Sequence, residues 1–250
     1  MSKIVKLPKR IRLMLFRNAI HVPRIFFRLM NYATNETVSE EKKYELMREI
    51  GVRGCKSGNV TVHGYGFDLL PQQSGYIMFP NHQGLFDVVG LISLNTVPFS
   101  VVIKKEAYDI FCLRQMVQTM GGLFMDRDDP RQGLQIINEM AKQVKDGRNF
   151  LIFPEGTRSK NGNKLGEFKS GSFKAATKAK CPIVPIAIID SFLPFDNTLT
   201  EQVDVQIHVL PPIPYEEYQG MKTVEIANMV KERIEKVIAQ NEHNFNEQYR

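Results

Sequence analysis

The sequence predicts an α/β fold: a largely parallel central sheet flanked by helices, preceded by an N-terminal amphipathic helical segment. Short apolar runs alternate with longer amphipathic ones from about residue 60 onward, which is the pattern of repeated strand–helix units. The 250 residues are 43% hydrophobic and 24% charged, which is typical of a globular chain that buries a core. Basic residues crowd the first 30 positions, whereas the rest of the chain is nearly neutral.

The N-terminal arm, residues 1–33, carries the positive charge of the chain. Its first 30 residues contain eight basic and no acidic residues, so residues 31–250, with 25 basic and 27 acidic residues, have a net charge of −2. Basic residues recur at helical spacing at Arg17, His21, Arg24 and Arg28. Apolar residues fall mostly along another face, at Ile11, Leu15, Val22, Phe26 and Leu29. Pro23 predicts a kink or a division into two short helices.

A basic amphipathic helix rich in Phe, Leu and Arg typically lies at the surface of an anionic membrane. We therefore expect residues 1–33 to form membrane-interface helices. Two other interpretations are a surface helix packed on its own domain and a nucleic-acid-binding arm. The absence of acidic residues disfavours the first. The aliphatic and aromatic bulk disfavours the second, so no nucleic-acid partner is expected.

No segment of the sequence predicts a transmembrane helix. The longest uncharged apolar run, Val88–Ile103, has 16 residues and contains Asn95 and Pro98, whereas a spanning helix needs about 20 apolar residues. A secretory signal is not expected, because basic residues interrupt the apolar part of the arm. Three widely spaced cysteines without CxxC spacing indicate free thiols in a reducing cytosol. We expect a peripheral, monotopic protein on the cytoplasmic face of the cell membrane.

Residues 34–58 are interpreted as a connecting helix and loop, with the helix over 36–50. A Gly-rich stretch runs from Gly51 to Gly66. Residues 59–250 are interpreted as one further domain. Apolar runs predict strands at Val60–His63, Tyr76–Phe79, Ser100–Ile103, Leu123–Met125, Phe150–Phe153, Ile183–Ile189 and Val203–Leu210. Helices are predicted over 85–95, 105–119, 131–146, 169–180 and 222–242. The last helix has a core-facing stripe at Val224, Met229, Val230, Ile234 and Ile238.

Two polar motifs follow directly after predicted strands, and ligands of open parallel sheets gather beyond the carboxyl ends of the strands. The first motif is Asn-His-Gln-Gly-Leu-Phe-Asp at 81–87. Five residues along a regular helix leave two side chains about 140° apart, so direct pairing requires His82 in the loop before the helix and Asp87 in its first turns. Asp87 then accepts from one imidazole nitrogen and leaves the other as an unprotonated general base. The alternative is a structural histidine; a metal site is not expected, because no second His or Cys is nearby.

The second motif, Phe-Pro-Glu-Gly-Thr-Arg-Ser at 153–159, predicts an anion-binding loop. Gly156 and Thr157 offer backbone N–H groups, and Arg158 offers a bidentate guanidinium to a phosphate. Glu155 either contacts a polyol hydroxyl or fixes the loop. The chain lacks the nucleotide-binding pattern G-x-x-x-x-G-K-[ST] and the serine nucleophile elbow G-x-S-x-G.

Further basic residues follow other strands. Lys104 and Lys105 come directly after one predicted strand, and Arg127 follows another. Singly, each is most simply an ordinary surface charge. Three cationic positions after three strands indicate a shared anion site instead.

Four blocks in this order resemble the glycerolipid acyltransferase family, and within it the bacterial 1-acylglycerol-3-phosphate acyltransferases. They are Asn81-His82-x4-Asp87, Gly121-Gly122 through Arg127, Phe153 to Ser159, and Val184-Pro185-Ile186. The stretches Lys105-Glu106 and Phe168 to Phe173 are also similar. The resemblance covers about residues 60–210, and the basic arm is similar to the interfacial two-helix motif of such enzymes. The ordered combination is specific, although each block alone is not.

The resemblance implies an O-acyltransferase of phospholipid biosynthesis. It would move a fatty acyl group from a thioester, acyl-CoA or acyl carrier protein, to the sn-2 hydroxyl of lysophosphatidic acid, forming phosphatidic acid. His82 would be the base and Asp87 its partner, with no metal or other cofactor. The acceptor would be bound by Lys105, Arg127, Glu155, Gly156, Thr157 and Arg158. Neither the choice between Lys104 and Lys105 nor the donor follows from the sequence.

Other functions stay open on the sequence alone. Within the same class, the acceptor is alternatively glycerol-3-phosphate or another lysolipid. A non-catalytic peripheral protein that binds anionic lipid would not depend on His82. A thioesterase would use the same base to activate water. Neither of these last two explains the second motif as well as acyl transfer does.

Overall fold

The computed structural model describes residues 7–196 and 200–242. In this part of the chain, one sheet is formed by β1 (Val60–Tyr65), β2 (Ile77–Pro80), β3 (Ser100–Lys104), β4 (Leu123–Met125), β5 (Phe150–Leu151), β6 (Ile183–Ile189) and β7 (Val203–Val209). Its strand order is β1-β7-β6-β2-β5-β3-β4. Neighbouring strands are parallel except for β6 and β7, which are antiparallel. The expected α/β fold with a largely parallel sheet is therefore confirmed.

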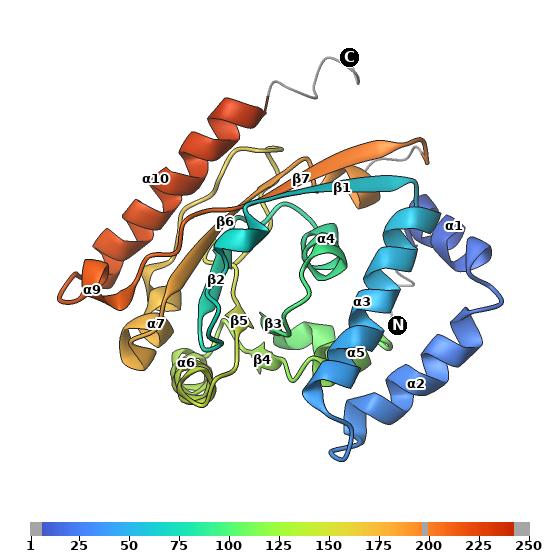
Figure 1. The fold of residues 1–250 in the computed structure, drawn as a ribbon, viewed down its shortest axis with the longest axis horizontal. Coiled ribbons are helices and arrows are strands. Elements are labelled where there is room, and N and C mark those ends of the chain that lie inside the picture. Colours follow the sequence, from blue (N-terminus) through green and yellow to red (C-terminus); the bar gives the residue numbers. More distant parts are fainter. Residues whose placement is uncertain (1–6, 197–199, 243–250) are drawn as a thin grey trace.

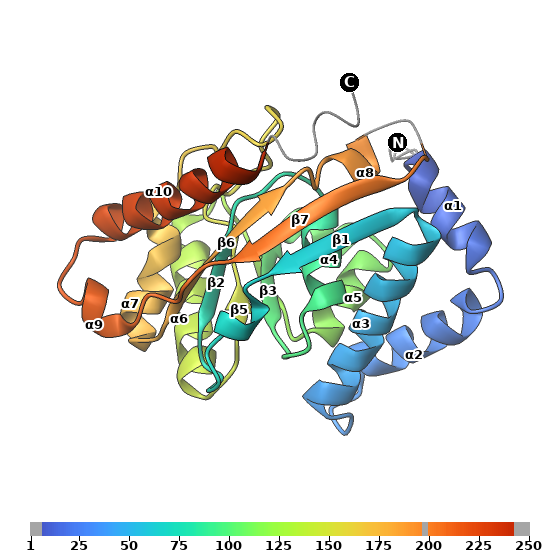
Figure 2. The same cartoon turned by 45° about the horizontal axis from the view of Figure 1, so that its top comes forward.

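Helices cover both faces of the sheet. They are α1 (Lys9–Arg17), α2 (Val22–Thr34), α3 (Glu40–Ser57), α4 (Phe86–Leu94), α5 (Leu113–Thr119), α6 (Pro130–Lys145), α7 (Lys174–Ala179), α8 (Leu193–Asp196), α9 (Tyr215–Tyr218) and α10 (Thr223–Asn241), with short 3-10 helices η1 (Phe67–Leu69), η2 (Lys105–Asp109) and η3 (Ser170–Phe173). Helices α6, α7 and α10 pack on one face, and α3, α4 and α5 on the other (Figures 1 and 2). Two apolar cores result, one on each side of the sheet.

The predicted strands lie within a residue or two of the observed ones. The largest differences are two residues: β1 continues to Tyr65 rather than ending at His63, and β5 ends at Leu151 rather than Phe153. Strand β5 is short because the chain leaves the sheet ahead of the turn that begins at Pro154. Two predicted helices are each divided. The segment 105–119 becomes η2 and α5, and Cys112 between them has a φ of +69°, which a helix does not accommodate. The segment 169–180 becomes η3 and α7.

Two further expectations are corrected by close packing. The connecting helix, α3, runs to Ser57 rather than residue 50. Glycine at position 51 lets this helix pack closely on α4, because a Cβ there would lie 3.3 Å from the Val89 carbonyl oxygen. In α10, the buried residues are Ile226, Ala227, Val230, Ile234 and Ile238. Val224 is 55% exposed rather than core-facing, since it lies off this stripe in the first turn.

The arm forms two helices, as Pro23 predicts: α1 ends at Arg17, and Pro23 lies in the first turn of α2. This division breaks the single basic face expected from Arg17 to Arg28. Arg17 donates to the Ser57 carbonyl (3.0 Å) and to Asn59 Oδ1 (2.6 Å). Arg28 in α2 pairs with Glu49 of α3 at 2.7 Å. The arm residues 1–6 lie outside the described part of the chain.

Arg10 fixes the arm to the rest of the protein. Its side chain is fully buried, and Nη1 donates to the carbonyl oxygens of Gly58 (2.5 Å), Asn59 (3.2 Å) and Glu201 (2.8 Å). Helix α2 packs on α3 and α5. The arm is thus docked on its own domain, the arrangement that the sequence disfavoured. Its outer side chains still include Phe16, Ile20 and Phe27, which are 80%, 90% and 72% exposed.

Candidate active site

The strand order brings the two motifs together. Strands β2, β5, β3 and β4 are neighbours and parallel. His82 follows β2, the loop 153–159 follows β5, Lys105 follows β3 and Arg127 follows β4. Because carboxyl ends of parallel strands meet at one edge of the sheet, all of these residues share that edge. The expectation that the motifs meet there is confirmed.

His82 and Asp87 form a direct pair. His82 lies in the loop before α4, Asp87 is the second residue of that helix, and Nδ1 lies 2.7 Å from Asp87 Oδ2. The same carboxylate is fully buried and accepts from the backbone N–H groups of Gln83 (2.8 Å) and Gly84 (3.1 Å). A carboxylate only accepts, so the neutral imidazole carries its proton on Nδ1. Nε2 then presents a lone pair, and no described residue forms a hydrogen bond with it.

The second motif holds the histidine in place from three directions. The imidazole stacks on the Phe153 ring with centroids 3.9 Å apart and planes inclined by 22°. The backbone N–H of His82 donates to Glu155 Oε1 at 2.7 Å, and the Ser159 N–H donates to the His82 carbonyl at 2.8 Å. The two loops therefore form one unit around the imidazole.

Glu155 is a buried carboxylate that binds backbone. Its second oxygen, Oε2, accepts from the Gly166 N–H at 2.8 Å. Residue 166 is glycine for a steric reason, because a Cβ there would lie 2.7 Å from Oε2. Burial raises the pKa of Glu155, and the two backbone N–H groups partly offset this rise. Of the two roles considered for Glu155, this geometry favours fixing the loop; substrate contact stays a prediction.

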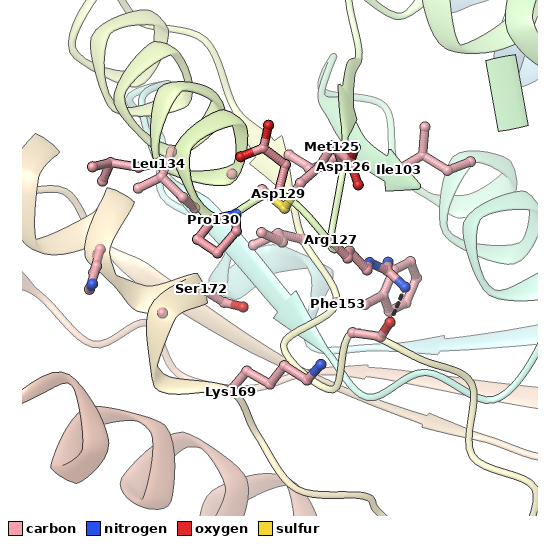
Figure 3. Close-up of a pocket in the computed structure, with 17 residues that line it drawn as sticks. Ile103, Met125, Asp126, Arg127, Asp129, Pro130, Leu134, Phe153, Lys169 and Ser172 are labelled. Carbon is pink, nitrogen blue, oxygen red and sulfur yellow. Dashed lines mark hydrogen bonds between the residues drawn. The ribbon is translucent and has the colours of Figure 1, made fainter. Parts of the chain in front are cut away.

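A cavity of about 270 Å³ opens beside the motif loop. Arg127 donates from Nη1 to the Gly156 carbonyl oxygen, and both residues line the cavity with Phe153 (Figure 3). Gly156 has a φ of +68°, a conformation that favours glycine. The remaining wall is mainly apolar and includes Val102, Ile103, Met125, Leu134, Ile137 and Ile152. The cavity thus combines an apolar wall with charged side chains, among them Arg127, Asp126, Asp129 and Lys169.

A second cavity, of about 360 Å³, lies beneath the loop that follows β5. Thr157 and Arg158 line it, together with three lysines, Lys160, Lys164 and Lys169. Arg158 is exposed and makes no hydrogen bond or ion pair with any residue that the structure describes. Lys169 lines both cavities. The lining also includes Glu155 and Glu167, so four cations and two carboxylates surround this cavity, and Arg158 has no ion-pair partner among the described residues.

The two lysines after β3 have different partners. Lys105 pairs with Asp126, which lines the first cavity, whereas Lys104 pairs with Glu106 at 2.6 Å. Lys105 is therefore the one directed toward the site. It is not an uncommitted cation, because the Asp126 carboxylate holds it and raises its pKa. Phosphate binding by Lys105 stays a prediction.

Sequence reasoning missed a buried polar network behind the first motif. Gln83 Nε2 donates to Asn163 Oδ1 at 2.6 Å, and Asn163 Nδ2 donates to Asp190 Oδ1 at 2.9 Å. The Ser191 N–H donates to Gln83 Oε1 at 2.8 Å, which closes the network. No local spacing signals contacts between residues 83, 163 and 190. Lys169 was also missed as a site residue, although it belongs to the Phe168–Phe173 stretch that carries part of the resemblance.

The described residues contain no cluster of three or more His, Cys, Asp or Glu suited to a metal ion. Within the same ranges, no helix is both long and apolar enough to cross a bilayer. Cys55, Cys112 and Cys181 are free thiols, as their spacing predicts.

The described chain is thus an α/β protein with a His–Asp pair and several cations at the carboxyl edge of its sheet, which are groups that general-base chemistry on an anion would use. Comparison with known proteins identifies its family. The chain belongs to the Acyltransferase family, whose sequence model matches residues 59–189.

Similar proteins from a bacterium, a plant and human are all named 1-acyl-sn-glycerol-3-phosphate acyltransferases. The chain is similar to the 1-acyl-sn-glycerol-3-phosphate acyltransferase of Salmonella typhimurium, with 30% identity over 66% of this chain and 67% of that one. It is 30% identical to the human alpha form over 63% of this chain and 56% of that one. A chloroplastic form from Brassica napus is 34% identical over 50% of this chain and 36% of its own length. The match thus spans about a third of the plant relative and just over half of the human one.

The crystal structure of the 1-acyl-sn-glycerophosphate (LPA) acyltransferase PlsC from Thermotoga maritima has a similar fold. Its TM-score to this chain is 0.74, with 20% sequence identity, over 94% of this chain and 97% of that one. This likeness covers nearly the whole chain. At this identity it shows the shared fold alone.

Proposed function

We propose that this chain transfers a fatty acyl group from an acyl thioester to the sn-2 hydroxyl of 1-acylglycerol-3-phosphate, forming phosphatidic acid. The observation that carries the proposal is the His82–Asp87 pair, which leaves Nε2 available as a base beside a row of cations. The relatives that share this family are named for the same reaction.

Each step of the reaction has a group to perform it. Nε2 of His82 takes the proton of the acceptor hydroxyl as its oxygen attacks the thioester carbonyl. Asp87 stabilises the imidazolium that forms, because its carboxylate already accepts from Nδ1 at 2.7 Å. When the carbon–sulfur bond breaks, the proton passes from Nε2 to the leaving thiolate. The new ester bond joins the acyl group to the acceptor, and the enzyme returns to its starting form.

Cations of the second cavity bind the acceptor phosphate in this proposal. Arg158 has no counter-ion among the described residues, and Thr157 and Gly156 belong to the same loop. Lys105 and Arg127 extend the positive charge along the sheet edge, and Lys169 adds a further amine between the two cavities. A guanidinium binds a phosphate through two parallel hydrogen bonds, which fixes its orientation.

The donor in this proposal is acyl-CoA or acyl carrier protein, and the reaction as written uses no metal or other cofactor. We further propose that the enzyme works as a peripheral protein on the cytoplasmic face of the membrane. Exposed Phe16, Ile20 and Phe27 and the exposed cations Arg12 and Arg24 of the arm support contact with anionic lipid.

The test is acyl transfer by the full chain bound to vesicles that contain labelled lysophosphatidate, with either acyl-CoA or acyl carrier protein as donor. We expect phosphatidic acid from the wild type and loss of most turnover in His82→Ala. His63→Ala is the matched control, because His63 also pairs with an aspartate, Asp204 at 2.8 Å, away from the site. We expect this variant to retain wild-type activity.

Other outcomes would redirect the proposal. Product from glycerol-3-phosphate but not from lysophosphatidate would change the acceptor. Free fatty acid released without any acceptor would indicate a thioesterase. Lipid binding without product from either donor or acceptor would leave a non-catalytic protein and overturn the proposed reaction.

A further inference from the structure

The end of η2 and the turn before α5 expose an unusual group of large apolar side chains. Tyr108, Ile110 and Phe111 are 46%, 54% and 61% exposed, within four residues of one another. Single exposed apolar residues are ordinary, whereas a contiguous group indicates a contact surface. This turn belongs to the domain that carries the catalytic pair and not to the N-terminal arm.

The turn is held in an outward conformation. Cys112 has a φ of +69°, a backbone conformation that residues other than glycine rarely adopt. Its backbone N–H donates to the Oε1 atom of buried Gln115 at 2.8 Å. The guanidinium of Arg114 lies 5.0 Å from the Tyr108 ring centroid, and Tyr108 packs edge-on against Phe124 at 5.2 Å. The exposure of Phe111 is therefore built into the fold.

The exposed turn continues the apolar surface of the arm. The Phe26 ring of α2 lies between Phe27 and Phe111, with centroid distances of 5.9 Å and 6.0 Å. Phe27 is 72% exposed and Phe111 61% exposed, and α2 packs on α5. Three aromatic rings thus link the arm to the domain in one strip of surface.

We infer that Tyr108–Phe111 is a second membrane-contacting element, which inserts together with α2 into the surface of an anionic bilayer. This inference rests on the proposed membrane location of the enzyme and adds a contact outside the arm. A lipid surface suits aromatic and aliphatic side chains flanked by cations. Exposed cations near this strip are Arg24 of α2, Lys104 at the end of β3, and Lys105 at the start of η2, which is paired with Asp126. Two acids, Glu106 and Asp109, lie in the same segment, and Glu106 is paired with Lys104.

The position of this element connects the membrane to the candidate site. Helix η2 begins at Lys105, whose partner Asp126 lines the first cavity, and ends next to the exposed turn. Only Glu106 and Ala107 therefore separate the site lysine, Lys105, from the proposed lipid contact that begins at Tyr108. This placement lets a lysolipid present its headgroup to the site while its acyl chain stays in the bilayer.

A single-tryptophan variant tests the contact directly, because the chain contains no tryptophan. Phe111→Trp is bound to vesicles of mixed anionic and zwitterionic lipid, and the emission maximum and quenching by brominated lipid are measured. We expect a blue shift and quenching. Val224→Trp is the matched control: Val224 is 55% exposed on α10, whose end beside α9 lies across the molecule from α1 and α2 (Figures 1 and 2). For Val224→Trp we expect no blue shift of the emission maximum and no quenching by brominated lipid.

Vesicle partitioning of a second variant gives an independent measurement. Ile110→Ser with Phe111→Ser removes two half-exposed apolar side chains, and we expect about tenfold weaker partitioning or more. Val224→Ser should change partitioning less than about twofold. Acyl transfer is not measured, so a failure here is distinguishable from a failure of the proposed reaction.

Three outcomes would overturn the inference. If the Phe111→Trp protein binds vesicles while its indole stays in water, the arm alone makes the contact. Equal partitioning of the double variant and the wild type would show that the turn contributes nothing. A blue shift that depends on protein concentration in the absence of vesicles would indicate a second copy of the chain as the occupant.

Discussion

Asp87→Asn is the sharpest test of the base assignment, because it changes the charge of the pair and little else. The side chain is fully buried, and Oδ2 accepts from three donors: His82 Nδ1, the Gln83 N–H and the Gly84 N–H. With the amide oxygen in the Oδ2 position, these three bonds survive, and only the 3.1 Å bond from the Gly84 N–H to Oδ1 is lost. With the amide nitrogen there, Nδ1 must become an acceptor, and Nε2 then carries the proton and no longer acts as a base.

Both orientations lower turnover. In the first, the imidazolium that forms during the reaction loses its anionic partner at 2.7 Å. Hydrogen bonds to charged groups contribute about 1.5–3 kcal/mol, which alone corresponds to a factor of roughly 10 to 150 in rate. In the second, the whole contribution of a general base is lost, a factor of about 10² to 10⁴. We expect kcat to fall by about tenfold or more, with little change in the KM for lysophosphatidate.

The assay is steady-state formation of phosphatidic acid on vesicles, with thermal melting to confirm the fold. Asp204→Asn is the control, since it makes the same change in the His63–Asp204 pair between β1 and β7. That variant should retain at least half of the wild-type kcat. A folded Asp87→Asn enzyme with more than a tenth of the wild-type kcat would refute the assigned role of the pair.

Three further predictions rest on other contacts. Arg158→Ala should raise the KM for the acceptor about tenfold or more, because it removes a phosphate contact. Lys160→Ala, which changes another residue that lines the same cavity, should raise this KM less. Equal effects of the two substitutions would contradict phosphate binding by Arg158. Arg10→Ala should lower the free energy of unfolding by about 3 kcal/mol, because three carbonyl oxygens lose a charged donor. Denaturant unfolding measures this loss, and Arg12→Ala, at an exposed position, should show none. Burial raises the pKa of Asp190 above 3.8, so the folded state holds this proton more tightly than the unfolded state, and stability falls as pH rises through the folded pKa. Asp190→Asn should therefore raise the melting temperature at about pH 7 but not at about pH 3, and an equal gain at both would contradict this cause.

Much of the site was predictable because its decisive contact is local. The pairing of His82 and Asp87 depends on five residues of chain and one helix start, and both can be read from the sequence. The cations after β3, β4 and β5 were also found from their positions after apolar runs. Their partners were not, since the bonds from Lys105 to Asp126 and from Arg127 to Gly156 join different loops.

By itself, the sequence determined the α/β class, most strand positions, the division of the arm at Pro23 and the two motifs. These features follow from periodicity, backbone restriction and short spacing, which act within about ten residues. The tertiary structure alone decided that β5 lies between β2 and β3, which brings Glu155 to the backbone of His82. It also decided that Arg10 is buried and that Phe26 meets Phe111. Those contacts depend on how distant segments pack, and packing of the whole chain, rather than local propensity, selects among the alternatives.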